Sequence, residues 1–295
     1  MDLYQTSLAF KGCNGATKYS FKEKINSLNL TKEDLLNGCV ISDLNNFILS
    51  DIHFLLKKAV LNIVAADRNI NQGFFNWGFI TSYYSNFYSI QNLNRLSLNF
   101  NVWLESRYKF ELHNAVTKEL YLKKSDSTGN THENEFNLFF TNFNNFKNKK
   151  SINRFWTLGI RQFKLGHEPF LRNEINYTIN NDYYYEIGLE KRIFDKIIDD
   201  NKNNPADNKL DIDSPKNFAL YNIELAVSRI AMTVYVLNYM ASSNIEYKSY
   251  LIKLLREINS EIDLKYSSTN AWLLTLLKSI LKFEEFEIDE DIKIT

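Results

Sequence analysis

The spacing of apolar residues predicts two long helices in the first third of the chain. From Ser42 to about Arg68, apolar side chains recur every three or four positions, which places them on one helical face. A polar turn at 69–73 follows, and residues 74–96 repeat this spacing with aromatic side chains. We therefore expect an antiparallel helical hairpin with a buried aromatic stripe. The spaced positions of the second helix are Trp77, Ile80, Tyr83, Tyr84, Phe87, Tyr88, Ile90 and Leu93.

The period then changes from that of a helix to that of a strand. Between residues 96 and 124, apolar and polar side chains alternate, as they do around Phe100 and Phe110. This alternation predicts a small antiparallel meander. The polar stretch 125–134 predicts a loop, and phenylalanines at helical spacing predict a further helix over 136–146.

The first 42 residues predict a less regular segment. We expect a short strand near Leu8–Lys11, followed by a turn. Thr31 with Asp34 is typical of a helix start, because a hydroxyl and a carboxylate three residues apart can cap the first turn.

The second half of the chain alternates between helical patterns and polar breaks. Residues 155–165 predict a helix that ends at Gly166, and residues 175–187 fit either a hairpin or a helix–turn–helix. After the polar, proline-bearing stretch 199–217, apolar spacing predicts three more helices. They cover residues 218–240, 247–262 and 271–283. The expected division is an N-terminal segment (1–42), a helical bundle (43–200) with a β insertion near 96–124, and a C-terminal helical region (218–295).

Composition supports a mainly α fold. Aromatic residues make up 15% of the 295 residues, so rings should fill much of the core. Only 9 glycines and 3 prolines occur, which argues against a turn-rich β sandwich or barrel. We expect a cytoplasmic protein with no membrane segment, because neither a signal-peptide core nor an apolar run of about 18 residues is evident.

Charge and cysteine content narrow the classes of ligand. Lysine plus arginine and aspartate plus glutamate number 35 each. Nucleic-acid binders usually carry excess positive charge, so this balance weighs against tight nonspecific binding but permits a local RNA-cleaving site. Cys13 and Cys39 lack the spacing of metal ligands. The HExxH, CxxC, phosphate-loop, GxGxxG and GxSxG motifs do not occur, so we expect neither a metal nor a cofactor.

The chain has four histidines, and two of them follow an arginine by six positions. His53 lies in the apolar face of the first long helix and is interpreted as a core histidine, whereas His132 lies in the polar loop and is interpreted as solvated. The remaining two, His113 and His167, follow Arg107 and Arg161. A histidine can move the proton of a ribose 2′-hydroxyl, and an arginine can hold the phosphate, without a metal.

The pair Arg161 and His167 is the first candidate for this chemistry. Six residues on a straight helix would turn the two side chains apart, but Gly166 can end the helix and let them converge. Arg172 lies within reach of the same loop as a helper, or forms a surface ion pair with Glu174.

The pair Arg107 and His113 is the second candidate. Its arginine lies on an alternating segment and its histidine at an expected turn, which favours a structural role. An incidental spacing of arginine and histidine is the alternative for both pairs.

The aromatic helix resembles the second helix of HEPN-like proteins. In that family a pattern of the type Trp-x5-Tyr-Tyr-x2-Phe packs a compact helical bundle. This sequence carries the pattern as Trp77, Tyr83, Tyr84 and Phe87. Residues 171–177, Leu-Arg-Asn-Glu-Ile-Asn-Tyr, are similar to the Arg…Tyr segment of the family's fourth helix, and the resemblance extends over residues 43–180.

The resemblance implies a bundle that commonly dimerises and is often a metal-independent ribonuclease. In such enzymes an Arg-x4–6-His motif meets its copy at the dimer interface, and the domains are frequent in toxin–antitoxin and anti-phage systems. Carried onto this chain, the motif matches Arg161 and His167 best, and Arg107 and His113 less well. The family usually has a small polar residue after the arginine, where this chain has glutamine or tyrosine.

Two functions are therefore open. The first is an RNA-cleaving effector in which His167 is the acid/base, Arg161 anchors the phosphate and Arg172 assists. The second is a non-catalytic HEPN-like subunit, because many members of the family only bind partners. It would bind a partner protein through an aromatic surface or through the acidic residues 283–295.

Overall fold

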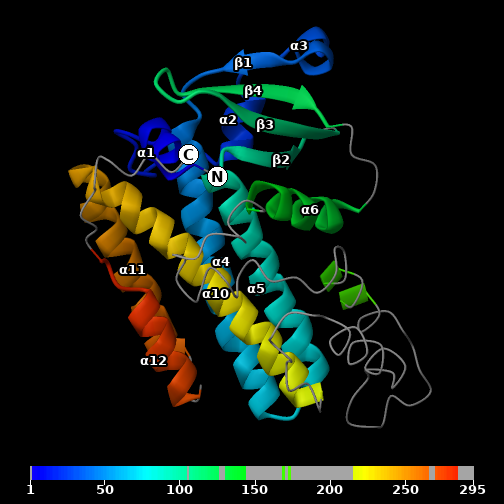
Figure 1. Ribbon diagram of the computed structural model, residues 1–295, viewed down its shortest axis with the longest axis vertical. Helices are drawn as coiled ribbons and strands as arrows, with labels where there is room; N and C mark the ends of the chain where they lie inside the picture. Colours follow the sequence, from blue (N-terminus) through cyan, green and yellow to red (C-terminus); the bar gives the residue numbers. More distant parts are fainter. Residues whose placement is uncertain are drawn as a thin grey trace.

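The computed structural model describes residues 2–104, 106–125, 130–143, 168–169, 172–173, 215–265 and 270–284. This part of the chain is mainly helical, with a small antiparallel sheet at one end of a helical bundle (Figure 1). The predictions that lie outside it include the helix over 155–165, the undecided segment 175–187, the pair Arg161 and His167, and most of the acidic residues 283–295.

Three long helices form the centre of the bundle. They are α4 (Asn45–Asn71), α5 (Phe75–Leu96) and α10 (Pro215–Ser242). Helices α4 and α5 form the predicted antiparallel hairpin, and α10 packs against both (Figure 1). Helix α11 (Ile245–Lys265) packs on α10 and α4, and α12 (Ala271–Ile280) packs on α10.

The contact between α4 and α5 depends on small residues as well as on rings. A Cβ atom added at Gly78 would overlap Ile70 Cγ1 and lie 3.3 Å from the Ala66 carbonyl oxygen. About two helical turns further along α5, the Ser85 hydroxyl donates to the Ala59 carbonyl at 2.7 Å. A stripe of small residues therefore lets the two backbones approach closely, next to the aromatic stripe that the sequence predicts.

Three members of the predicted aromatic stripe are not buried: Tyr84 and Tyr88 are half-buried, and Trp77 is exposed. Trp77 is 58% exposed, whereas Tyr83 is fully buried. Trp77 lies in the first turn of α5, next to the turn that joins α4 to α5. The expectation that Trp77 packs in the core is therefore wrong.

The predicted meander is confirmed and belongs to a sheet of four strands. These are β1 (Cys39–Ile41), β2 (Asn99–Trp103), β3 (Arg107–Asn114) and β4 (Glu119–Lys124), in the antiparallel order β1-β4-β3-β2. Phe100 and Phe110 are fully buried, and the ring of Phe21 packs edge-on against both, at 5.7 and 5.6 Å between centroids.

The N-terminal segment is helical where we expected a strand. Helix α1 (Leu3–Ala9) includes Leu8. Asp2 caps the start of this helix by accepting hydrogen bonds from the backbone N–H groups of Tyr4 and Gln5. Two short helices follow, α2 (Phe21–Asn26) and α3 (Lys32–Asn37). The predicted cap of α3 is confirmed, since Thr31 and Asp34 form a reciprocal capping box.

Helix α6 (Thr131–Phe143) lies between strand β2 and the upper part of α5 (Figure 1). Its buried phenylalanines confirm the predicted aromatic helix from Phe136 to Phe143, and residues 144–146 of that prediction lie outside the described residues. The helix begins within the stretch expected to be a loop. The Asn130 side chain accepts from the His132 N–H at 3.0 Å and so starts the helix early. This early start brings His132 onto the same face as Phe136.

Within the described residues, one stretch is long and apolar enough to cross a membrane, although the sequence patterns led us to expect none. It is Ala219–Ser242 in α10, and 78% of its most apolar window is buried inside the fold. The central helix of a folded bundle meets the same criteria of length and composition, so this stretch is weak evidence for a membrane segment.

Candidate functional site

The structure describes one of the two predicted arginine–histidine pairs. Arg161 and His167 lie outside the described residues. Arg107 and His113 both lie on strand β3, six positions apart. Since a strand rises about 3.3 Å per residue, their Cα atoms are roughly 20 Å apart. The second candidate pair therefore cannot act on one phosphate within a single chain.

Arg107 and His113 also differ in their surroundings. Arg107 is half-buried and donates to the Thr131 hydroxyl at 3.3 Å, which joins strand β3 to the start of α6. His113 is exposed near the end of β3. These positions agree with the structural interpretation that the sequence favours for this pair.

Arg172, the predicted helper, lies in a cluster of aromatic side chains. Its guanidinium donates to the Tyr84 hydroxyl, and its Cζ atom is 5.5 Å from the centre of the Tyr84 ring. A second guanidinium nitrogen donates to the Asn173 side chain at 2.6 Å. The contact with Tyr84 fixes the arginine on the surface of α5 rather than leaving it to swing in solvent.

His132 is the histidine that the structure adds to this cluster. Its ring stacks on Phe87 at 4.1 Å between centroids, and its Nδ1 atom lies 2.7 Å from the Tyr83 hydroxyl. The prediction that His132 is solvated is therefore wrong, because α6 begins early enough to turn it toward α5. Burial and, to a smaller extent, the Arg172 guanidinium lower the pKa of His132 to about 4. The imidazole is thus neutral at pH 7.

The Tyr83 hydroxyl stays protonated beside this imidazole. Burial raises the pKa of Tyr83, and the negative charge of Glu168 adds to this effect. A neutral phenol and a neutral imidazole can exchange donor and acceptor roles, depending on which ring nitrogen of His132 carries the proton. We call Tyr83, Tyr84, Phe87, His132 and Arg172 the arginine–tyrosine cluster.

A buried ion pair between Arg229 and Glu168 lies near Tyr83 of the arginine–tyrosine cluster. Two guanidinium nitrogens of Arg229, in α10, donate to the two carboxylate oxygens of Glu168 at 2.8 and 2.9 Å. The Arg229 side chain is fully buried and that of Glu168 is 4% exposed. Such a bidentate pair has a fixed geometry, so it holds Glu168 firmly against the bundle.

Further polar contacts satisfy the remaining donors around this ion pair. Arg229 also donates to the Asn86 side-chain oxygen at 2.9 Å, and Asn86 donates to the Asn222 side chain at 3.0 Å. Asn222 donates in turn to the Ser82 hydroxyl at 2.7 Å. The chain of hydrogen bonds joins α5 to α10 directly beneath the cluster, and makes the site a rigid one.

The sequence patterns do not reveal Arg229 or Glu168. The two residues are 61 positions apart, and their pairing depends on the tertiary fold. One signal was present: Arg229 is a charged residue within the apolar stretch of α10. A charged residue at a core position is rarely buried without a partner.

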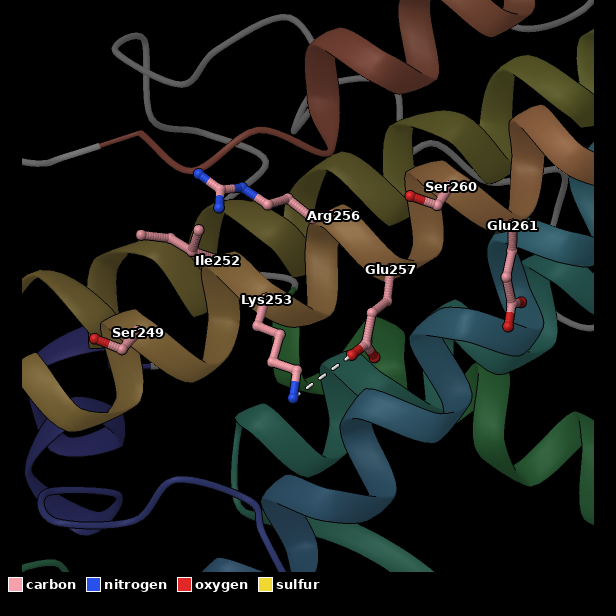
Figure 2. Close-up of a pocket in the computed structure, with 7 residues that line it drawn as sticks. All are labelled: Ser249, Ile252, Lys253, Arg256, Glu257, Ser260 and Glu261. Atoms are coloured by element: carbon pink, nitrogen blue, oxygen red, sulfur yellow. Dashed lines mark ion pairs between the residues drawn. The ribbon is translucent and has the colours of Figure 1, made fainter.

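A shallow groove lies on the outer face of α11. Its volume is about 500 Å³, and it is lined by Ser249, Ile252, Lys253, Arg256, Glu257, Ser260 and Glu261 (Figure 2). These residues all come from one face of one helix, where Lys253 and Glu257 form an exposed ion pair at 4.0 Å. The groove therefore has the character of a solvated helix face and not of a site with convergent groups.

His53 fills a position in the core, as the sequence predicts. Its Nε2 atom lies 3.0 Å from the Tyr247 hydroxyl, and its ring packs between Tyr247 and Tyr250. Gly15, with a φ of 77°, lies against the ring edge where a Cβ atom would overlap it. Within the described residues, no three histidine, cysteine, aspartate or glutamate side chains converge as metal ligands would.

The chain matches no protein-family model, no curated protein and no solved structure. The Arg172 guanidinium can contact phosphate oxygens, and the half-buried Tyr84 and His132 beside it offer a phenol hydroxyl, an imidazole and ring faces for nucleobases.

Proposed function

We propose that this chain is a metal-independent RNA-cleaving effector, of the kind found in bacterial toxin and anti-phage defence systems. The arginine–tyrosine cluster carries the proposal. It holds Arg172, which the sequence nominated as a phosphate-binding helper, beside a half-buried histidine and two tyrosines. Arginine and aromatic side chains in one partly exposed site are typical of proteins that bind phosphate and unpaired bases.

In the proposed reaction, a ribose 2′-oxygen attacks the neighbouring phosphorus and the bond from phosphorus to the 5′-oxygen breaks. His167 takes the proton of the 2′-hydroxyl and a proton is returned to the leaving 5′-oxygen. Arg161 anchors the phosphate, and Arg172 stabilises the charge that develops on its oxygens. The products are a 2′,3′-cyclic phosphate and a 5′-hydroxyl, and no metal takes part.

Two described residues near His167 in the sequence belong to rigid surroundings, which supports this assignment. Glu168 is held by the bidentate contact with Arg229, and Arg172 is held by Tyr84. Holding catalytic groups in place before the substrate binds is a major source of rate enhancement. Dimerisation through a HEPN-like interface is part of the same proposal.

The test is RNA cleavage by the purified chain in the presence of EDTA. We expect cleavage to persist in EDTA and to fall at least a hundredfold in His167→Ala, which is the usual contribution of a general acid or base. Arg172→Ala should lose about tenfold or more, because one charge-assisted contact to the phosphate is removed. The matched control is Arg256→Ala, an exposed arginine on α11 that should leave cleavage unchanged.

Undiminished cleavage by His167→Ala would reject the catalytic assignment. If the folded wild-type chain cleaves no RNA, the second function, a non-catalytic HEPN-like subunit that binds a partner protein, becomes the better one. The exposed aromatic residues Phe74 and Trp77, 57% and 58% exposed at the α4–α5 turn, favour this alternative. Such exposed rings are enriched at protein interfaces.

A further inference from the structure

Three aromatic rings and two cations form a row along the seam between α4 and α5. Lys58 places its ammonium 4.4 Å from the centre of the Phe54 ring and 5.3 Å from the centre of the Tyr88 ring. The rings of Tyr88 and Tyr84 are 6.3 Å apart, and Arg172 lies over Tyr84. The row therefore runs Phe54, Lys58, Tyr88, Tyr84 and Arg172, and it ends in the arginine–tyrosine cluster.

The row is accessible to a ligand along its length. Phe54 is 56% exposed, and the other four side chains are half-buried. A cation–π contact between residues four apart on a helix is common and needs no functional explanation. The contact between Lys58 and Phe54 alone does not explain why a phenylalanine in the middle of a long helix is exposed. It also does not explain why two further rings and a second cation lie in line with this pair.

The electrostatics of the seam favour an anionic ligand. Helix α5 contains no acidic residue, and α4 contains two, Asp51 and Asp67. Asp51 is neutralised by Arg95 at 2.6 Å, and Asp67 is buried and accepts from the Asn270 N–H at 2.9 Å. Lys58 and Arg172 are the two cations of the row, on a chain whose net charge is zero.

We propose that this row binds an extended single-stranded nucleic acid, with bases stacked on Tyr88 and Phe54 and phosphates beside Lys58 and Arg172. Rings that alternate with cations are the usual platform for unpaired strands, because every base has a face to stack and every nucleotide a phosphate. A duplex hides its base faces and cannot use the rings. The inference rests on the proposed function only in that the row ends at Arg172, the helper residue of the proposed cleavage.

The experiment measures binding apart from cleavage. Fluorescence anisotropy is recorded with labelled 12-mers of 2′-O-methyluridine and of thymidine, and with a 12-base-pair duplex of 2′-O-methyl RNA, because none of these has the free 2′-hydroxyl that the proposed cleavage needs. Both single strands should bind, and the duplex should bind at least tenfold more weakly. Phe54→Ala and Tyr88→Leu should each weaken single-strand binding about tenfold, whereas Tyr88→Phe should retain it, because the ring remains.

Charge and fold are tested with matched variants. Lys58→Ala should weaken binding and reduce the slope of log affinity against log salt by about one, since one phosphate contact is lost. Trp272→Ala and Lys253→Ala, an exposed ring and an exposed cation on other helices, should bind like wild type. Circular dichroism melts confirm that each variant is folded.

The outcomes separate this inference from the proposed function. Single-strand binding without cleavage would reject the nuclease and support the row. Cleavage with unchanged binding by Phe54→Ala and Tyr88→Leu would reject the row and retain the nuclease. Equal affinity for duplex and single strand, no oligonucleotide binding, or binding of a protein partner alone would overturn the inference.

Discussion

The histidines of this chain show how burial sets the charge of single residues. His53 is enclosed by Tyr247, Tyr250 and Gly15, and burial lowers its pKa from 6.5 to about 3. Within the described part of the chain its Nδ1 atom makes no hydrogen bond, so a second proton on the ring would have no acceptor. His132 is partly exposed and has a less perturbed pKa of about 4.

This burial predicts a stability that depends on pH. Because the pKa of His53 is lower in the folded state, the unfolded chain binds more protons between pH 3 and 6.5. The stabilisation is complete above pH 6.5 and is lost as the pH falls toward 3, by an amount on the order of a few kcal/mol. Urea denaturation at several pH values measures this slope.

Two glutamine variants, His53→Gln and His113→Gln, test whether His53 causes this dependence of stability on pH. His53→Gln cannot titrate and should flatten the dependence of stability on pH between 4 and 6.5, leaving the smaller contribution of His132. His113→Gln, at an exposed position of β3, should leave the slope unchanged. An equal slope in both variants would show that His53 does not carry the effect.

At the scale of elements, the close contact between α4 and α5 predicts that Gly78 tolerates no larger residue. Alanine would gain about 1 kcal/mol of helix propensity at this position. Its Cβ atom, however, would overlap the buried Ile70 side chain and press on the Ala66 carbonyl, and overpacking costs about 1–3 kcal/mol. We expect Gly78→Ala to be destabilising in urea denaturation.

A second substitution tests the cause of this effect. In the background of Ile70→Ala, the atom that Gly78→Ala would overlap is absent, so the cost of the added methyl group should largely disappear. The coupling energy between the two substitutions measures the contact directly. Additive effects of the two substitutions would mean that the helices do not approach at Gly78.

Elements with a long periodic pattern could be predicted from the sequence, and short elements could not. Helices α4 and α5 and the meander repeat their spacing over many residues, so each position supports the others. Strand β1 has three residues and exists because it pairs with β4, about 80 positions away. The start of α6 depends on one capping side chain, Asn130, within a stretch that is polar throughout.

The candidate site was predictable only in part, for the same reason. Arg172 could be nominated from the sequence, because an arginine suits the proposed chemistry wherever it lies, whereas Tyr84 was predicted only as part of the aromatic stripe. Their contact, and the place of His132 beside them, come from the packing of α6 on α5. Residue spacing along the chain carries no information about such packing.

At the scale of the whole molecule, the Arg229–Glu168 pair joins distant parts of the chain beneath the proposed site. Its two side chains are removed from water, and each has the other as its compensating charge. Breaking a buried pair by removing one partner costs about 3–5 kcal/mol, because the remaining charge is left buried alone. We therefore expect Arg229→Met and Glu168→Gln each to lower the free energy of unfolding by several kcal/mol in urea denaturation.

The double variant and an exposed pair make this last prediction specific. Arg229→Met with Glu168→Leu removes both charges, so it should be more stable than either single variant that strands a charge. Lys278 and Asp263 lie 2.6 Å apart but are 43% and 55% exposed, so Lys278→Met should cost less than about 1 kcal/mol. If Arg229→Met cost no more than Lys278→Met, the buried pair would not stabilise the fold. Loss of RNA cleavage in the double variant, with stability largely restored, would show that the pair also positions the segment that carries Arg172.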